Sequence, residues 1–411
     1  MNSVLRVTTC LIIACLCIGA CSGFGGQQAG EGGEAPPFHV RDDLFDHELP
    51  DTLGLAPAPG KQTITVFRPG DADNAFNHGV VLMPFKNRLY AQWQTSARDE
   101  DAADTHVVYS VSDNGRDWSV PAVLAPKWDN GIRTSGGWWT DGETLVAYIN
   151  VWPESEGLPT QGMTQFITSV DGVNWSSPQF VTARDGDPVP GVFEQDPHPL
   201  PDGRIIGAFH IQPGLHIAPW YTDDPLGVSG WTAGALQNLS FPGDTSRAME
   251  PSWFYRDDGA AVMVFRDQGG SFRKLASVSS DRGVTWTQPV LTDMPDSRSK
   301  QSAGNLPDGT AYQVNNPSTD RSRMPLAIVT SADGLLFDEA FLLRSGGADL
   351  QPLRYQGRYK RAGYSYPKSV VWGDYLYVAY ATNKEDVEIT RVPLLYISRS
   401  GGRRPGEIPQ R

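Results

Sequence analysis

The residues of this chain that could do chemistry are charged, amide and aromatic groups at the ends of short alternating apolar segments. They stand near segment starts at Asn77, His78, Trp138, Glu194, Arg247, Glu250, Lys300, Tyr364, Tyr366 and Lys368, and near segment ends at Gln94, Asn150, His210, Arg266, Asn316 and Asn383. Aromatic faces stack on sugar C–H groups, and amide and guanidinium donors bind hydroxyls and carboxylates. This set therefore favours a carbohydrate partner.

Two other kinds of chemistry are disfavoured. All four Cys lie within the first 21 residues, so the body of the chain can use neither a disulfide scaffold nor cysteine catalysis. The seven His show no metal-ligand spacing, so we expect no metal and no cofactor. The net charge of −13 argues against nucleic acid, because phosphate binding needs a basic face.

The elements that must position these groups are shown by a repeat of Ser or Thr, Asp, Gly and an aromatic residue. Its fullest copy, SSDRGVTW, ends at Trp286, and other copies end at Trp118, Trp175, Trp231 and Phe337. The steps between these aromatic residues are 57, 56, 55 and 51. Asp and Ser side chains can bond the backbone of a tight turn, Gly permits positive φ, and the ring packs into the sheet. The motif predicts a structural hairpin turn without a catalytic role.

A second repeat places a turn, often Asp-Gly, between two short alternating strands. Clear copies cover residues 199–210, 255–266 and 305–316, and looser copies cover 85–94, 140–150 and 371–383. Six copies predict an all-β, six-bladed β-propeller over residues 62–396, with four antiparallel strands in each blade. The sixth blade lacks the aromatic turn, and we expect residues 63–67 to supply its missing strand and close the ring.

The turn motif resembles the Asp box of sialidase-like β-propellers, and the resemblance spans about residues 62–396. In such propellers the polar strand ends converge in a funnel at the axis. The resemblance implies an exo-acting glycoside hydrolase that removes a terminal acidic sugar with retention. It also implies catalytic roles: Tyr364 as nucleophile, with Tyr366 as the alternative, Glu250 as its base, and Asp101 of the loop 97–106 as acid and base.

The resemblance further implies residues that bind the substrate. Arg266, at the end of a second strand, and Arg323, after an Asn-Pro, match arginines that hold a carboxylate; Arg321 is the alternative to Arg323. We expect Lys368 and Asn316 to join them in the funnel.

One departure affects the substrate. Sialidases open the first blade with an Arg-Ile-Pro motif, whereas this chain has Asn77 followed by His78, so two arginines remain where three are usual. We expect both residues to line the substrate site. The departure leaves two alternatives open. A uronate lyase or atypical rhamnosidase-type propeller could use His78 and Tyr364, or the propeller could bind a glycan without turning it over.

The N-terminus predicts export. Arg6 precedes an apolar stretch that ends in IGAC at Cys21, which resembles a bacterial lipobox with Cys21 as the lipidated residue. Because Ser22 follows, we expect an outer-membrane or cell-surface lipoprotein; the alternative is an ordinary signal cut near Ala20 and a periplasmic or secreted protein.

The predicted organisation follows from these features. Residues 1–21 are a lipoprotein signal peptide, 22–37 a flexible tether, 38–61 an N-terminal extension, 62–396 the propeller and 397–411 a C-terminal tail. We expect a monomer that touches the membrane through its lipid anchor alone.

Overall fold

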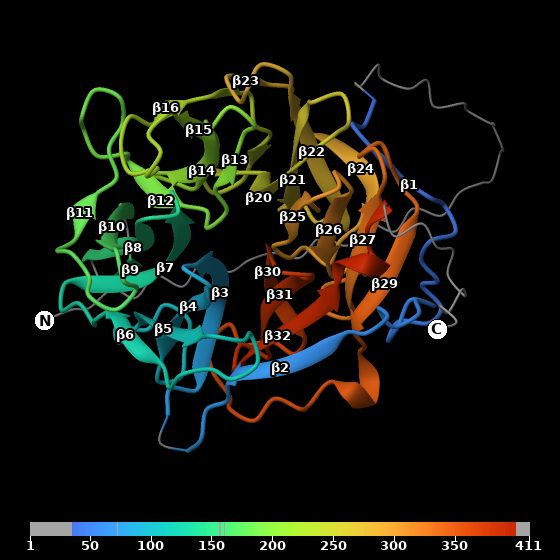
Figure 1. The fold of residues 1–411 in the computed structure, drawn as a ribbon, viewed down its shortest axis with the longest axis horizontal. Coiled ribbons are helices and arrows are strands. Elements are labelled where there is room, and N and C mark those ends of the chain that lie inside the picture. Colours follow the sequence, from blue (N-terminus) through green and yellow to red (C-terminus); the bar gives the residue numbers. More distant parts are fainter. Residues whose placement is uncertain (1–34, 72, 156–157, 160, 400–411) are drawn as a thin grey trace, which may run out of the picture. The chain divides into compact units, whose positions relative to one another are not determined.

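A computed structural model describes residues 35–71, 73–155, 158–159 and 161–399, which belong to one compact unit. Cys21, the predicted lipidation site, lies outside these residues. Six sheets of four or five strands are arranged in a ring around an axis, so the predicted six-bladed β-propeller is confirmed (Figure 1). No helix in the described ranges is long and apolar enough to cross a membrane.

Each blade is an antiparallel sheet whose first strand lies nearest the axis. The first blade contains β3 (Phe76–Phe85), β4 (Arg88–Ser96), β5 (His106–Ser112) and β6 (Ala122–Ala125). The second contains β7 (Gly131–Thr140), β8 (Leu145–Ser155), β10 (Met163–Ser169) and β11 (Gln179–Phe180), with β9 (Leu158–Pro159) beside β8. The third contains β12 (Gly191–Phe193) and β13 (His198–Pro199), both paired with β14 (Ile205–Ile211), then β15 (His216–Thr222) and β16 (Thr232–Ala233).

The remaining blades follow the same order. The fourth contains β20 (Ala248–Tyr255), β21 (Ala261–Asp267), β22 (Arg273–Ser279) and β24 (Val290–Pro295). The fifth contains β25 (Ser302–Asn305), β26 (Ala311–Asn315), β27 (Leu326–Ser331) and β29 (Glu339–Arg344). The sixth contains β30 (Tyr364–Trp372), β31 (Tyr375–Thr382), β32 (Asp386–Pro393) and β2 (Gln62–Phe67).

Short elements connect or cover the blades. They are β1 (His39–Val40), β17 (Ala235–Leu236), β18 (Ser240–Phe241), β19 (Thr245–Ser246), β23 (Thr285–Trp286), β28 (Leu336–Phe337) and the 3-10 helices η1 (Gly347–Asp349) and η2 (Leu394–Tyr396). The segment before β2 packs on the fifth blade: β1 pairs in parallel with β28, and the buried Phe38 ring lies 5.2 Å from Phe337.

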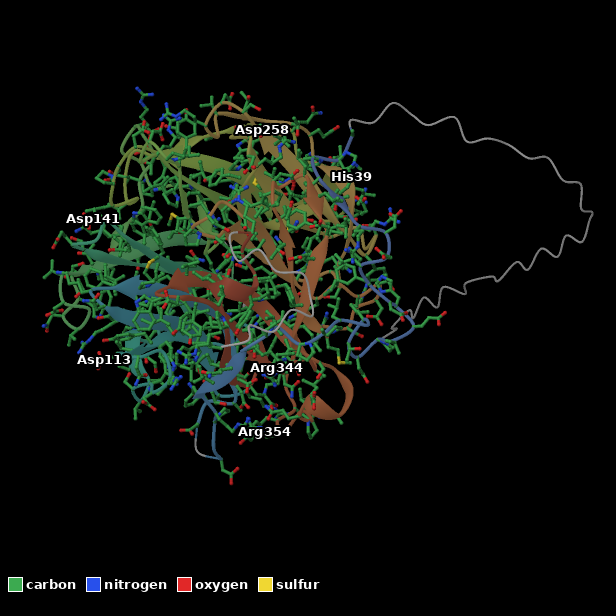
Figure 2. The ribbon with its side chains drawn as sticks, turned by 45° about the vertical axis from the view of Figure 1, so that its right-hand side comes forward. His39, Asp113, Asp141, Asp258, Arg344 and Arg354 are labelled. Carbon is green, nitrogen blue, oxygen red and sulfur yellow. The ribbon has the colours of Figure 1, made fainter. Side chains whose placement is uncertain are left out.

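The hydrophobic core is divided among the six gaps between neighbouring blades. Each of six buried clusters draws its residues from two adjacent sheets; for example, one joins Tyr90 of the first blade to Trp138 of the second. Both faces of every blade are therefore buried, which explains why the strands are apolar on both sides. Exposed charges lie outside this core, as Asp113, Asp141 and Asp258 do in Figure 2.

The Asp-box turns have the bonding that their sequence predicts. In the second blade, Asp171 Oδ1 accepts the N–H groups of Val173 at 2.9 Å and Asn174 at 2.8 Å, and Ser169 Oγ accepts that of Gly172 at 2.8 Å. Gly172 has φ +71°, and a Cβ there would meet the Tyr90 hydroxyl at 2.0 Å, so this position needs glycine. The turn is structural, as expected.

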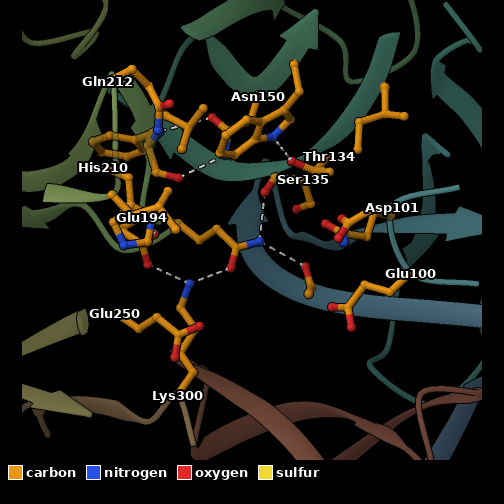
Figure 3. A pocket seen from close by; sticks show the side chains of 18 of the residues that line it. Glu100, Asp101, Thr134, Ser135, Asn150, Glu194, His210, Gln212, Glu250 and Lys300 are labelled. Atoms are coloured by element: carbon orange, nitrogen blue, oxygen red, sulfur yellow. Dashed lines mark hydrogen bonds and ion pairs between the residues drawn. The ribbon is translucent and has the colours of Figure 1, made fainter. Parts of the chain in front are cut away.

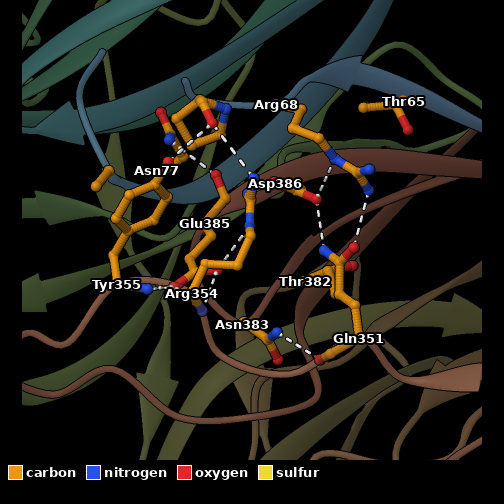
Figure 4. A network of polar contacts seen from close by, with 12 residues as sticks. Thr65, Arg68, Asn77, Gln351, Arg354, Tyr355, Thr382, Asn383, Glu385 and Asp386 are labelled. Atoms are coloured by element: carbon orange, nitrogen blue, oxygen red, sulfur yellow. Dashed lines mark hydrogen bonds and ion pairs between the residues drawn. The ribbon is translucent and has the colours of Figure 1, made fainter. Parts of the chain in front are cut away.

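The ring is closed by the N-terminal strand. β2 pairs antiparallel with β32, which confirms the strand expected at residues 63–67. A buried polar network supports the closure (Figure 4). Asp386 pairs with Arg68 at 2.9 Å and also with Arg354, while Glu385 accepts the backbone N–H of Tyr355 at 2.7 Å. The loop between the fifth and sixth blades is thereby tied to the start of the ring.

Candidate active site

A cavity of about 850 Å³ opens at the axis, where the inner strands begin and the second strands end. Several inner strands carry a bulge at this level: the pairing shifts between His78 and Val81 in β3, between Met249 and Ser252 in β20, and between Ser365 and Lys368 in β30. A residue with left-handed backbone occupies each bulge, and two of these are Glu250 (φ +53°) and Tyr366 (φ +56°). Such strained bulges re-aim side chains and gather at functional sites.

Tyr366, Glu250 and Arg266 form a triangle, of which Tyr366 and Glu250 line the cavity. Arg266 Nη1 donates to Glu250 Oε2 at 2.9 Å and to the Tyr366 hydroxyl at 3.2 Å. Burial opposes ionisation of Glu250, but the charges of Arg266 and Lys300 outweigh it, so the pKa of Glu250 is lowered. Burial first, and then the Glu250 charge, raise the pKa of the Tyr366 phenol. At neutral pH the pair is a carboxylate beside a protonated phenol, a base next to its acid.

Tyr364, the first choice for nucleophile, does not line this cavity. Its ring is buried in the core between the fifth and sixth blades, and its hydroxyl donates to the Ser345 carbonyl at 2.7 Å. The bulge in β30 explains the difference, because it turns Tyr366 towards the axis and leaves Tyr364 facing the neighbouring blade. The tyrosine in the site is therefore the alternative, Tyr366.

Arg323 is a second arginine, besides Arg266, that contacts the tyrosine. The guanidinium of Arg323 lies 4.9 Å from the centre of the Tyr366 ring and donates to Ser365 Oγ at 2.8 Å. Arg321 is exposed, so Arg323 is the one beside the ring. Arg361, which the sequence analysis missed, is also near: partial burial and then the charge of Arg323 lower its pKa. These arginines lie behind Tyr366 and are not among the residues that line the cavity.

Asn77 and His78 are neighbours in β3, but only one of them lines the cavity. Asn77 is fully buried and structural: its amide donates to the Glu385 carbonyl at 2.8 Å and accepts from the Trp93 indole at 2.9 Å. It does not line the cavity, contrary to expectation. His78 does: its ring centre is 4.4 Å from that of Tyr366, and neither ring nitrogen has a hydrogen-bond partner. Burial and then the charge of Lys384 lower its pKa well below the usual value, so the imidazole is neutral.

The loop after β4 brings two carboxyl groups to the rim, on the far side of the cavity from His210 (Figure 3). Asp101 lines the cavity; partial desolvation of its carboxyl group and then the charge of Glu100 raise its pKa. Glu100 forms an ion pair with Lys384 and lies 4.0 Å from His78 Nε2. Burial lowers the pKa of Lys384 to about 8. A carboxyl group with a raised pKa suits proton donation.

Two expected binding residues lie elsewhere. Lys368 comes after the bulge in β30 and lines a second cavity farther along the inner strands, where it pairs with Asp196 at 2.9 Å. Asn316 is fully buried, and its amide donates to the Pro325 carbonyl at 3.1 Å. Both residues were expected in the funnel because they lie near strand ends. Which cavity a residue reaches also depends on which side of the bulge it lies and on where its side chain points.

Among the described residues, no group of three or more His, Cys, Asp or Glu could hold a metal ion.

Gln195, which was not predicted from the sequence, bridges the axis: its amide donates to the Ser135 carbonyl at 2.7 Å and accepts from Lys300 at 2.8 Å. No local pattern marks it, because its role comes from left-handed backbone at φ +68°.

Solved structures share this fold at low sequence identity. A sialidase is 20% identical, with a TM-score of 0.62 over 87% of this chain and 35% of its own. The intramolecular trans-sialidase from Ruminococcus gnavus, determined with oseltamivir carboxylate, is 14% identical, with a TM-score of 0.62 over 84% of this chain and 99% of its own. Trypanosoma rangeli sialidase with sialic acid is 13% identical, with a TM-score of 0.57 over 82% and 60%. The chain spans about a third of the first sialidase's length, and these identities show the fold alone.

No curated protein matches the sequence. The sequence profile of the BNR repeat-like domain matches residues 87–378, which is more than half of the chain. This range contains the Asp-box turns at Trp118, Trp175, Trp231, Trp286 and Phe337. The protein therefore belongs to the BNR repeat-like domain family, with a sialidase-like β-propeller fold.

Proposed function

We propose that this protein is a retaining glycoside hydrolase that acts on an acidic sugar, with Tyr366 as the nucleophile. The observation that carries the proposal is the triangle of Tyr366, Glu250 and Arg266, in which a phenol and its base line the cavity and a cation donates hydrogen bonds to both. The sialidases among the structural relatives support it at the level of the fold.

The reaction follows from these groups in two steps. Glu250 takes the phenolic proton while the Tyr366 oxygen bonds to the anomeric carbon, and the bond to the leaving oxygen breaks as Asp101 gives that oxygen its proton. Asp101, now a carboxylate, then takes a proton from water. The water oxygen displaces the tyrosine, and Glu250 returns the proton to it. Two displacements retain the configuration of the sugar.

The charges of the site favour an acidic sugar. Arg266 and Arg323 both contact Tyr366, and Arg361 is near Arg323, so their positive charge stands next to the tyrosine. A guanidinium pair can hold a carboxylate through two hydrogen bonds, and a neutral phenol avoids the repulsion that an anionic nucleophile would meet.

The test compares an acidic substrate with its uncharged form. The 4-methylumbelliferyl α-glycoside of sialic acid and its methyl ester have the same leaving group. We expect hydrolysis of the acid, loss of about 100-fold or more in kcat/KM for the ester because a charged hydrogen-bond partner is removed, and release of the α-anomer by proton NMR. Equal hydrolysis of both, release of the β-anomer, or no hydrolysis at all would contradict the proposal.

A uronate lyase is the second candidate, because His78 has a neutral, unpartnered imidazole that packs against the Tyr366 ring at a tilt. Such a ring could take the proton next to a uronate carboxyl group held by Arg266. Absorbance at 235 nm from the unsaturated product, on uronate polymers, distinguishes elimination from hydrolysis. Binding of a glycan without either product would favour a non-catalytic propeller.

We also propose that the protein is exported and anchored through a lipid on Cys21, as the lipobox-like sequence indicates. The test is to follow the protein in cell fractions. We expect wild type in the membrane fraction and Cys21→Ser in the soluble exported fraction; wild type in the soluble fraction would contradict the anchor.

A further inference from the structure

The cavity extends well beyond the tyrosine, across the second and third blades. We call its outer part the His210 side, defined by Asn150, Trp152, His210, Gln212 and Thr245. Figure 3 shows His210, Gln212 and Asn150 together at one side, away from Glu100 and Asp101. Pockets of about 300–1,000 Å³ hold drug-sized ligands, so 850 Å³ leaves room for more than one sugar ring.

His210 is fixed by a carboxylate and presents an unused nitrogen. Its Nδ1 lies 2.7 Å from Glu194 Oε1, so Nδ1 carries a proton and donates it to this carboxylate. Nε2 is buried without any hydrogen-bond partner, and the residue is 8% exposed. A buried polar atom left unpaired is unfavourable, so Nε2 fits a ligand that forms a hydrogen bond with it.

Two neighbours also have unused groups. The side-chain Nε2 of Gln212 is a donor without a partner, and Thr245 Oγ1 can donate or accept and is also unpartnered. A hydroxyl group both donates and accepts, so the hydroxyl groups of a sugar can bond to His210 and to Gln212. Trp152, held through its indole N–H to Thr134 Oγ1 at 3.1 Å, adds an aromatic lining of the kind that suits sugar rings.

The His210 side carries no uncompensated charge. The Glu194 carboxylate is balanced by Lys300 at 2.9 Å and bonds His210. The other residues that define this side are amides, a hydroxyl and an indole. None of Arg266, Arg323 and Arg361 is among the residues that line this side. An anionic group gains nothing at the His210 side, whereas an uncharged hydroxyl-bearing group does.

We propose that the His210 side is a binding subsite for a neutral sugar unit next to the acidic sugar that reacts. The Glu194–His210 pair and Gln212 recognise its hydroxyl groups. The subsite extends the glycan-active function proposed above, but its binding role does not require hydrolysis. Because Asp101 lies at the other side of the cavity, the leaving group departs away from this subsite. The neutral unit is therefore attached to the glycone, and the preferred substrate is longer than a single terminal sugar.

The test is saturation-transfer NMR of the full chain with lactose, cellobiose, maltose and xylobiose at millimolar concentration. We expect at least one disaccharide to bind. His210→Asn keeps an amide N–H near Nδ1 for Glu194 but removes Nε2, and should weaken binding about 3- to 10-fold; Gln212→Ala should do the same. The matched control is His39→Gln, which removes an exposed histidine–carboxylate pair of 3.0 Å outside the cavity and should change nothing.

Binding and hydrolysis are separated by Tyr366→Phe, which should bind the disaccharide as wild type does. If wild type hydrolyses no acidic glycoside but binds a neutral disaccharide in a His210-dependent way, the subsite stands and the proposed function fails. If acidic glycosides are hydrolysed but no disaccharide binds, or if binding survives both His210→Asn and Gln212→Ala, the subsite is refuted and the proposed function stands.

Discussion

Two tyrosines two residues apart in β30 provide the sharpest perturbation of the site. Tyr366→Phe removes the hydroxyl that accepts from Arg266 at 3.2 Å, while the Arg266–Glu250 pair at 2.9 Å remains. Tyr364→Phe removes the hydroxyl that donates to the Ser345 carbonyl at 2.7 Å in the core. The same atom is deleted in both, so the two variants are matched.

We expect one variant to lose activity and the other to lose stability. Tyr366→Phe deletes the proposed nucleophilic oxygen and should reduce kcat about 1,000-fold or more, which corresponds to about 4 kcal/mol in activation free energy. Its stability should stay near wild type, because the ion pair beneath it is retained. Tyr364→Phe loses one hydrogen bond worth about 1 kcal/mol of unfolding free energy, a fall of roughly 2 °C or less in Tm, with kcat unchanged.

The assay combines two measurements on both variants and wild type. Release of 4-methylumbelliferone from the α-sialoside gives kcat and KM, and differential scanning calorimetry gives Tm. The reasoning is refuted if Tyr366→Phe retains activity while folded, or if Tyr364→Phe with an almost unchanged Tm loses activity as far as Tyr366→Phe does. The second result would make Tyr364 the reacting group despite its buried hydrogen bond.

Three further perturbations test other parts of the account. Glu250→Gln should lower kcat about 100- to 10,000-fold, since the base is lost; a kcat within threefold of wild type in steady-state assays would contradict its role. The reaction needs the protonated form of Asp101, and the pKa of Asp101 is raised, so wild-type activity should fall as the pH rises through that pKa. The pH–rate profile of Asp101→Asn should lack this fall. If the fall is unchanged in the variant, Asp101 is not the acid. Glu385→Gln leaves Lys360 buried without its carboxylate and should lower the free energy of unfolding, measured with denaturant, by about 3–5 kcal/mol. The control is Asp257→Asn, which removes an exposed pair with Arg399 and should lower it by less than about 1 kcal/mol. Equal losses in both variants would refute the role of the network.

The fold was predictable because its signals are local. Each Asp-box turn contains its own hydrogen bonds, between Asp171 and Asn174 for example, so the motif survives in sequence at a spacing that counts the blades. Closure by β2 was predictable because the sixth repeat is one strand short and a ring leaves no sheet edge.

The sequence predicted which segments reach the site, but not which side chains of those segments face the axis. Glu250 and His78 line the cavity, and Arg266 and Arg323 contact Tyr366 beside it. The bulges in the inner strands were invisible in the sequence, and a bulge changes which residue faces the axis.

Two kinds of error follow from this. The bulge in β30 turns Tyr366 inward instead of Tyr364 and sends Lys368 to the second cavity. Contacts between distant segments, such as that of Lys384 with Glu100, carry no local pattern at all. Such contacts depend on how the blades pack, which a single sequence does not encode in its repeats.

The central claim, a glycosyl bond to Tyr366, is tested most directly by trapping that bond. A sialic acid analogue with fluorine at the anomeric carbon and at the carbon next to it slows the second step, so the sugar–enzyme intermediate accumulates. Trypsin releases residues 362–368 as one peptide that contains both Tyr364 and Tyr366, and fragmentation in the mass spectrometer assigns the modified residue. The account predicts the sugar on Tyr366. A sugar on Tyr364 or on any carboxylate would contradict it, as would turnover without any labelled peptide.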